Sequence, residues 1–98
     1  MEPKQYWVCI LASRPGGALY VGVTNNLFLR VWQHRQSRGS EHTKRYGIER
    51  LVYYEAYADV RDAIQRESNT KHWPRSWKTQ LIYGMNPTWR DLYEELNG

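Results

Sequence analysis

Two short runs of apolar and β-branched residues occur close together, YWVCILA at residues 6–12 and LYVGV at 19–23. Runs of this length that are bounded by turn-forming residues predict strands. Between them lies SRPGGA at 13–18, where Pro15 fixes one backbone angle and the glycines that follow tolerate positive φ. The pattern therefore predicts a β-hairpin.

After the hairpin the spacing of apolar residues lengthens to that of a helix. The polar run TNN offers N-cap oxygens to a predicted helix at about 26–36, with Leu27 and Val31 as its buried stripe. A third strand is predicted at 50–57, where the run reads RLVYYEAY.

The rest of the chain predicts helices. Asp59, with Asp62 three residues later, begins one, and Pro74 ends it and begins another. After the break GMNP, Thr88 is predicted to cap a last helix. That helix would carry Trp89, Leu92, Tyr93 and Leu96. The order β-β-α-β-α-α-α indicates an α+β fold in which helices cover a small antiparallel sheet.

Length and composition predict one small domain over residues 1–98. The formal net charge is +4 and the first 50 residues hold eight Lys/Arg against three Asp/Glu, which favours an anionic partner. A single cysteine excludes an internal disulfide and a cysteine-based zinc cluster. The longest apolar run is too short to span a bilayer and no signal peptide is recognised, so a cytoplasmic protein without membrane contact is expected.

Arg30 and His34 lie one turn apart on the first predicted helix, beside its buried stripe. An arginine there can bind two phosphate oxygens, and a histidine can accept or pass a proton near neutral pH. The alternative is a surface pair at ordinary helical spacing.

Glu67 occupies a position on the next predicted helix where the apolar pattern calls for a hydrophobic residue. Val60, Ala63 and Ile64 define the face, and Glu67 continues it. An unpaired buried carboxylate is costly, so Glu67 needs a partner. That partner is either Lys71, one turn later, or a metal ion.

The metal alternative has a definite chemistry. One carboxylate beside a tyrosine, an arginine and a histidine is too sparse for a metal site made only of protein ligands. It suffices for Mg²⁺, or Mn²⁺, that keeps most of its waters and takes a phosphate oxygen of the substrate. This combination indicates phosphodiester hydrolysis.

A basic loop follows the first helix. Its candidate phosphate contacts, together with Lys71, are Arg35, Arg38, Lys44, Arg45 and Tyr46. Contacts of this kind give sequence-independent affinity for nucleic acid, although the loop could also be an ordinary solvated one. Trp73, Trp77 and Leu81 follow helical spacing and are predicted to belong to the core.

These motifs together resemble the GIY-YIG nuclease superfamily, and within it small proteins related to the N-terminal domain of the UvrC excision-repair nuclease. The resembling segments, in order, are YVG at 20–22, RVWQH at 30–34, TKRYGIERLVYYE at 43–55, RES at 66–68 and NPTWRDL at 86–92. The resemblance implies a three-stranded antiparallel sheet flanked by helices. It also implies a metal-dependent endonuclease that acts on DNA, with RNA left open, and a connection to DNA repair.

The resemblance assigns one role to each site residue. Tyr20 would activate or orient the attacking water, and Arg30 would stabilise charge on the scissile phosphate. His34 would act as a general base or as a partner of the tyrosine. Glu67 would hold the single divalent cation, and Asn86 would brace the site or the substrate.

One position departs from the family pattern. The tyrosine of the GIY half falls at residue 9, which is Cys9 here. Tyr6 is three residues away, so strand parity points it to the opposite face. Cys9 is interpreted as a small buried apolar residue. A non-catalytic nucleic-acid-binding module, or a domain recruited by a partner protein, therefore stays open as an alternative.

Overall fold

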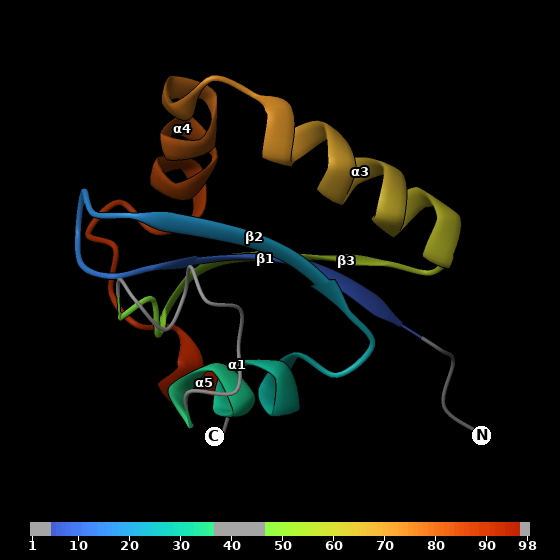
Figure 1. Ribbon diagram of the computed structural model, residues 1–98, viewed down its shortest axis with the longest axis horizontal. Helices are drawn as coiled ribbons and strands as arrows, with labels where there is room; N and C mark the ends of the chain where they lie inside the picture. The colour runs from blue at the N-terminus through green and yellow to red at the C-terminus, as the bar shows by residue number, and fades with distance from the viewer. Residues whose placement is uncertain (1–4, 37–46, 97–98) are drawn as a thin grey trace.

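The centre of the fold is a three-stranded antiparallel sheet. A computed structural model describes residues 5–36 and 47–96, and its strands are β1 (Tyr6–Ala12), β2 (Leu19–Thr24) and β3 (Arg50–Tyr57). Their order is β2-β1-β3, so β1 is the central strand (Figure 1). The predicted α+β class and all three predicted strands are confirmed.

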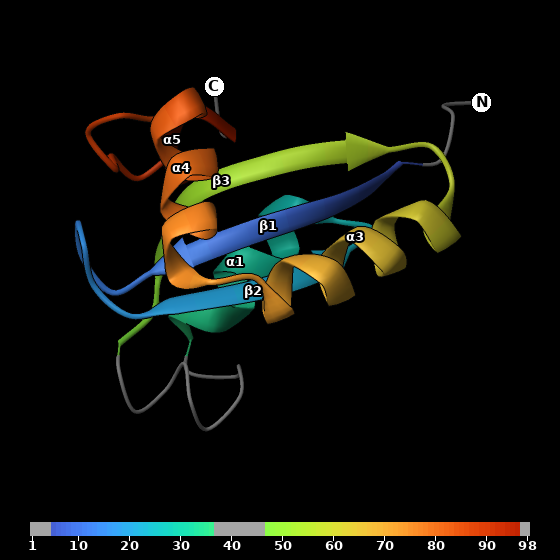
Figure 2. The ribbon, with the colours of Figure 1, turned by 90° about the horizontal axis from the view of Figure 1, so that it is seen from above.

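Helices cover both faces of this sheet. They are α1 (Leu27–Arg35), α3 (Val60–His72), α4 (Arg75–Met85) and α5 (Tyr93–Leu96). In Figures 1 and 2, α1 and α5 lie on one face and α3 and α4 on the other. None of the helices in the described part of the chain is long and apolar enough to cross a membrane.

Strand alternation divides the core into two layers. Cys9 and Leu11 face α1, whereas Val8 and Ile10 face α3 and α4, and all four side chains are buried. In the antiparallel register Cys9 pairs with Gly22, and Leu11 pairs with Tyr20. Because side chains alternate along a strand, Tyr20 lies on the same face as Cys9.

Polar caps explain where the helices begin. The side chain of Asn26 accepts the backbone N–H of Leu29 at 3.0 Å and begins α1. Asp59 accepts the N–H of Arg61 at 2.8 Å and begins α3, and Pro74 precedes α4. These starts confirm what the cap residues predicted.

The predicted last helix is wrong in extent. Thr88 does not cap it, and helical structure is confined to the four residues of α5. Trp89 has φ +57°, a left-handed conformation that a helix cannot contain. Asp91 instead accepts the N–H of Tyr93 at 3.0 Å, at the start of α5. Trp89 and Leu92 are nevertheless buried.

The predicted apolar face of α3 is also wrong. Val60 and Ile64 are 39% and 52% exposed, whereas Ala63 and Thr70 are buried. The face toward the sheet thus carries small side chains, and Thr70 donates its hydroxyl to the carbonyl of Arg66 at 2.7 Å. Glu67 lies between Ala63 and Thr70 by helical spacing, so it still belongs to the inner face.

Candidate active site

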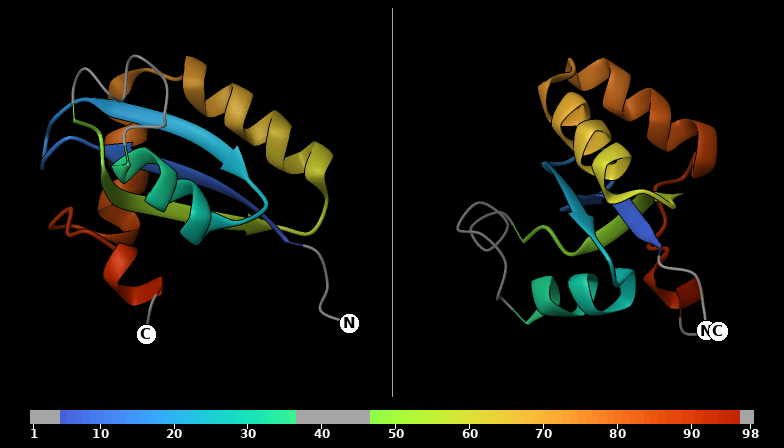
Figure 3. Two further views of the ribbon diagram at one scale, coloured as in Figure 1. Left: turned by 60° about the horizontal axis from the view of Figure 1, so that its bottom comes forward. Right: turned by 90° about the vertical axis from the view of Figure 1, so that its right-hand side faces the viewer.

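Three residues predicted to share a site are brought together on one face of the sheet. Tyr20 comes from β2, and Arg30 and His34 come from α1, which lies beneath that strand (Figure 3). Arg30 Nη2 donates to the hydroxyl of Tyr20 at 2.8 Å. The rings of Tyr20 and His34 have centroids 4.8 Å apart. Arg30 and His34 are therefore not a surface pair.

His34 is buried and has no hydrogen-bond partner among the described residues. Its residue exposure is 4%, and neither ring nitrogen is bonded to any of the described residues. Burial, and then the positive charge of Arg30, lower the pKa of His34 below its ordinary value. The imidazole is therefore neutral at pH 7 and has a free nitrogen lone pair that can accept a proton.

The absence of a side chain at Gly22 leaves room for the ring of Tyr20. A Cβ atom at residue 22 would lie 2.9 Å from Cε1 of Tyr20, closer than side chains tolerate. The ring thus lies against the bare backbone of its own strand, which only glycine permits. This contact is the structural reason for the glycine in the YVG segment.

Cys9 is a packing residue in the central strand. Its exposure is 0%, and burial raises the pKa of its thiol to about 12, so the group is a thiol at neutral pH. The interpretation of Cys9 as a small buried residue is confirmed. Tyr6 packs with the opposite layer of the core, as strand parity predicted.

Glu67 approaches the site from the other face of the sheet. Its side chain is 17% exposed and forms an ion pair with Lys71 at 3.2 Å, which is one of the two partners that the sequence left open. The pKa of Cys9 is affected by the charges of both Arg30 and Glu67, although α1 and α3 cover opposite faces. Both charges therefore act on Cys9, which lies in the central strand between the two helices.

Glu67 fits a metal ion only in a limited way. No group of three or more His, Cys, Asp or Glu side chains gathers within residues 5–36 and 47–96. A single carboxylate matches a hard cation that keeps several waters and binds substrate oxygen. The donor set thus fits magnesium or manganese with substrate present, and not a metal site made of protein ligands alone.

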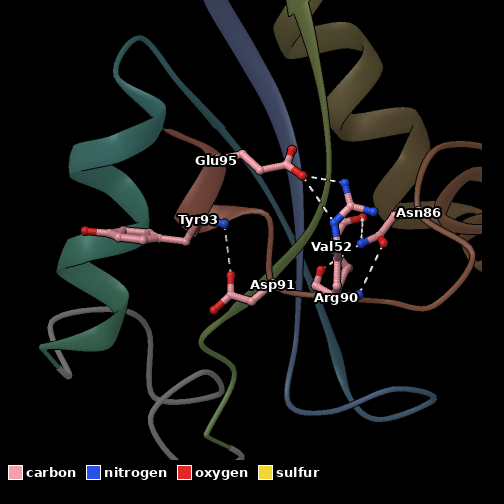
Figure 4. Close-up of polar contacts among 6 residues, drawn as sticks. All are labelled: Val52, Asn86, Arg90, Asp91, Tyr93 and Glu95. Carbon is pink, nitrogen blue, oxygen red and sulfur yellow. Dashed lines mark hydrogen bonds and ion pairs between the residues drawn. The ribbon is translucent and has the colours of Figure 1, made fainter. Parts of the chain in front are cut away.

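Asn86 braces the C-terminal loop. It is fully buried, and its amide donates to the carbonyls of Val52 at 3.2 Å and Arg90 at 2.8 Å (Figure 4). Its oxygen accepts the N–H of Arg90 at 3.2 Å. These bonds use its donors and its acceptor within the protein. Asn86 is therefore placed to support β3 and the loop after α4.

Arg35 is held within the fold. It forms an ion pair with Asp91, and its guanidinium lies 4.3 Å from the ring centroid of Tyr93. Asp91 also accepts the backbone N–H of Leu51 at 3.2 Å. Arg35 is thus a weaker candidate for phosphate contact than its place in the sequence indicated. The predicted contacts Arg38, Lys44, Arg45 and Tyr46 lie outside the described residues.

Sequence reasoning misplaced one tryptophan and missed one aspartate. Trp77 was predicted to be in the core, but it is 52% exposed on α4, while Trp73 and Leu81 are half-buried. Asp91 joins α1, β3 and α5, and no helical period reveals it because its partners Arg35 and Leu51 are distant in sequence.

Comparison with known proteins agrees with this arrangement. Residues 5–80 match the GIY-YIG catalytic domain. The match spans most of the chain, and the chain therefore belongs to the GIY-YIG family. A GIY-YIG domain indicates a nuclease-type function on nucleic acid, and nucleases of this family typically use a divalent metal ion.

The similar proteins are small UPF0213 proteins of the same family. A UPF0213 protein of Bacillus pumilus is 33% identical over 87% of this chain and 86% of its own length. One from Lacticaseibacillus paracasei is 31% identical over 92% of this chain and its full length. The solution NMR structure of a UPF0213 protein from Bacillus halodurans has a TM-score of 0.55 and 28% identity, covering 89% of this chain and 92% of that one.

Proposed function

We propose that this protein is a metal-dependent endonuclease that hydrolyses phosphodiester bonds of DNA. The observation that carries the proposal is the cluster of Tyr20, Arg30 and His34, in which a buried imidazole and a guanidinium keep nitrogens without partners among the described residues. Buried polar groups in folded proteins are almost always bonded. The unbonded nitrogens here belong to a guanidinium and an imidazole, and such groups can bind an anionic substrate.

Each member of the cluster has a role in the hydrolysis. Neutral His34 accepts a proton from the attacking water or from Tyr20, whose ring it touches. Arg30 donates one N–H to the hydroxyl of Tyr20, which stabilises that oxygen if it loses its proton. The remaining donors of Arg30 are available for the charge that develops on the phosphate.

Glu67 is the proposed residue for the cation. A divalent ion held there would polarise the phosphoryl group and stabilise the leaving oxygen. Lys71, which pairs with Glu67 at 3.2 Å, would release the carboxylate and contact phosphate instead. Asn86 supports the scaffold of the site through its bonds to Val52 and Arg90. We expect the protein to select DNA by its structure rather than by its base sequence, because the sequence contains no recognition-helix or zinc-finger motif.

Cys9 favours a second candidate function. Cysteine lacks the phenol that the family pattern places there, and its buried thiol is not ionised at neutral pH. The catalytic set is therefore smaller by one hydroxyl. On this account the protein binds nucleic acid without cutting it.

A cleavage assay distinguishes the two functions. End-labelled duplex, branched and single-stranded DNA are incubated with the protein in Mg²⁺, in Mn²⁺ and in EDTA. The nuclease proposal predicts metal-dependent cutting that Glu67→Gln removes. Glu94→Gln, which changes an exposed carboxylate on α5, is the matched control and should cut normally.

Binding is measured on the same substrates in EDTA. DNA that is bound but never cut in any metal would contradict the nuclease proposal and support the binding module. Cutting that persists undiminished in Glu67→Gln would remove Glu67 from the cation site.

A further inference from the structure

A groove lined by aromatic residues lies on the side of the sheet away from α1. Its volume is about 560 Å³, and its walls include Tyr53 of β3, Trp73 before α4, and Trp77, Gln80, Leu81 and Met85 of α4. We call it the α4 groove. Figure 2 shows α4 beside α3, over the face of the sheet opposite α1. The Tyr20–Arg30–His34 cluster does not include any of these residues.

The two tryptophans differ in how they are held. Trp73 is fixed by the guanidinium of Arg66, 4.7 Å from its ring centroid, and Arg66 is itself paired with Glu55 at 2.7 Å. Trp77 is 52% exposed and meets Trp73 edge to face, at 5.7 Å and 72°. The perpendicular arrangement means that Trp73 does not stack on Trp77. The exposed part of Trp77 can therefore contact a flat ring at the groove.

Positive charges lie beside the groove, and the nearby carboxylate of Glu55, which accepts the hydroxyl of Tyr53, is paired with Arg66. The sequence contains no aspartate or glutamate between Glu67 and Asp91, whereas Lys71, Arg75 and Lys78 fall in this stretch. Arg75 donates to the carbonyls of residues 16 and 17, at 3.0 and 2.7 Å, so no carboxylate neutralises it in those contacts. Lys78 likewise donates to a carbonyl, that of Lys71. An aromatic groove with a positive border complements an anionic ligand that carries flat rings.

Contacts link α4, which forms one wall of the groove, to the proposed cation site on α3. Lys78 Nζ lies 3.0 Å from the carbonyl oxygen of Lys71, and Lys71 Nζ lies 3.2 Å from Glu67. Arg66, which covers Trp73, directly precedes Glu67. We propose that the α4 groove binds a single-stranded DNA segment, with an unstacked base on Trp77 and the backbone along Lys71 and Lys78. The proposal deepens and rests on the proposed function, because it assigns substrates with a single-stranded part.

The test measures binding separately from cleavage. A labelled single-stranded oligonucleotide and its duplex are titrated in EDTA, and fluorescence anisotropy reports the affinity. Trp77→Ala should weaken single-strand binding about 5- to 100-fold, the loss expected for one stacked base. Duplex binding should change less. Tyr83→Ala is the control, since Tyr83 is an exposed aromatic residue of α4 outside the groove wall.

A second variant tests the groove without removing an aromatic ring. Gly84 lines the groove, and a Cβ atom there would meet nothing within 4 Å. Gly84→Leu therefore fills the groove while replacing a poor helix former. It should weaken single-strand binding as Trp77→Ala does. Lys78→Gln should lower the salt dependence of binding by about 0.7 in the log–log slope.

Three results would overturn the inference. One is unchanged single-strand affinity in folded Trp77→Ala and Gly84→Leu. Another is equal weakening by Tyr83→Ala. The third is self-association of the wild-type chain that Trp77→Ala abolishes without changing DNA affinity, which would make the groove a protein interface. The inference and the proposed function fail separately, because cutting that requires Arg30 can persist without Trp77, and Trp77-dependent binding can exist without cutting.

Discussion

Two buried polar side chains, His34 and Asn86, have opposite surroundings in this fold. Asn86 has 0% exposure and forms hydrogen bonds through both atoms of its amide (Figure 4). His34 has 4% exposure, and neither ring nitrogen is bonded to a described residue. A fully bonded group stabilises the fold. An unbonded one destabilises it, so the fold maintains His34 at a cost that binding or catalysis can explain.

The same contrast separates two arginines of one helix. Arg35 is neutralised by Asp91 and lies against Tyr93, whereas the charge of Arg30 has no carboxylate partner among the described residues. Arg30 therefore contacts Tyr20 of β2, and Arg35, at the end of the helix, contacts α5 and Asp91. On the proposed function, Arg30 is the one that meets substrate.

The largest expected effect is on cleavage activity, and it should differ between variants of these two arginines. Arg30→Gln should lower single-turnover cleavage by about 100-fold or more, because a charged donor to the phosphate is lost. Arg35→Gln should leave cleavage within a few-fold and instead reduce the free energy of unfolding by about 1–2 kcal/mol. Equal losses of activity in two folded variants would contradict the distinction.

Replacing Asn86 should chiefly affect stability. Asn86→Ala leaves the carbonyls of Val52 and Arg90 and the N–H of Arg90 without this partner. We expect a loss of about 2–4 kcal/mol in urea unfolding. The folded fraction should cut DNA at nearly the wild-type rate. A large fall in rate without a fall in stability would instead give Asn86 a direct role at the site.

Cys9→Tyr adds the missing phenol at a fully buried position. The larger side chain should destabilise the fold by about 1–3 kcal/mol, since the site has no exposed surface. Cys9→Ala, which adds no phenol, is the matched control. Activity that rises only in Cys9→Tyr would show that the lost hydroxyl limits the native site. Activity that falls in proportion to folding would show that it does not.

The smallest effect is a pH dependence of stability. Because the folded pKa of His34 is below its ordinary value, the unfolded chain binds the proton more readily. The His34 contribution therefore lowers stability as pH falls below about 6.5, with a slope of at most about 1.4 kcal/mol per pH unit. His34→Gln should flatten the curve of unfolding free energy between pH 7.5 and 5.5. An unchanged slope would show that the imidazole is not buried neutral.

Local signals predicted much of the fold and part of the site. The strands and the starts of α1 and α3 follow from runs of β-formers and from Asn26 and Asp59, which act on their own neighbours. Arg30 and His34 were found because helical spacing fixes their relation to each other. Their approach to Tyr20 depends on Gly22, and only the resemblance to the family placed these residues together.

Tertiary contacts decided what the sequence left unpredicted. The length of the last helix was overestimated. Asn86 and Asp91 bind the backbone of β3, and these contacts between distant residues cannot be predicted from a local sequence pattern. The sequence pattern placed Glu67 on the inner face of α3 correctly, although two residues used to define that face, Val60 and Ile64, are exposed. The i,i+4 spacing offered Lys71 as one of two possible partners, and the structure shows that pair. The exposure of Trp77 depends on how α4 meets the sheet.

The central claim is that Tyr20 takes part in phosphodiester hydrolysis. The most direct test compares Tyr20→Phe with Tyr54→Phe in single-turnover cleavage of labelled DNA. Tyr54 is on the same sheet face, opposite Cys9, and packs against Trp7. Only Tyr20 receives the hydrogen bond from Arg30 among the described residues. We predict at least about a 100-fold loss for Tyr20→Phe and wild-type cutting for Tyr54→Phe. Equal rates in both variants would contradict the account.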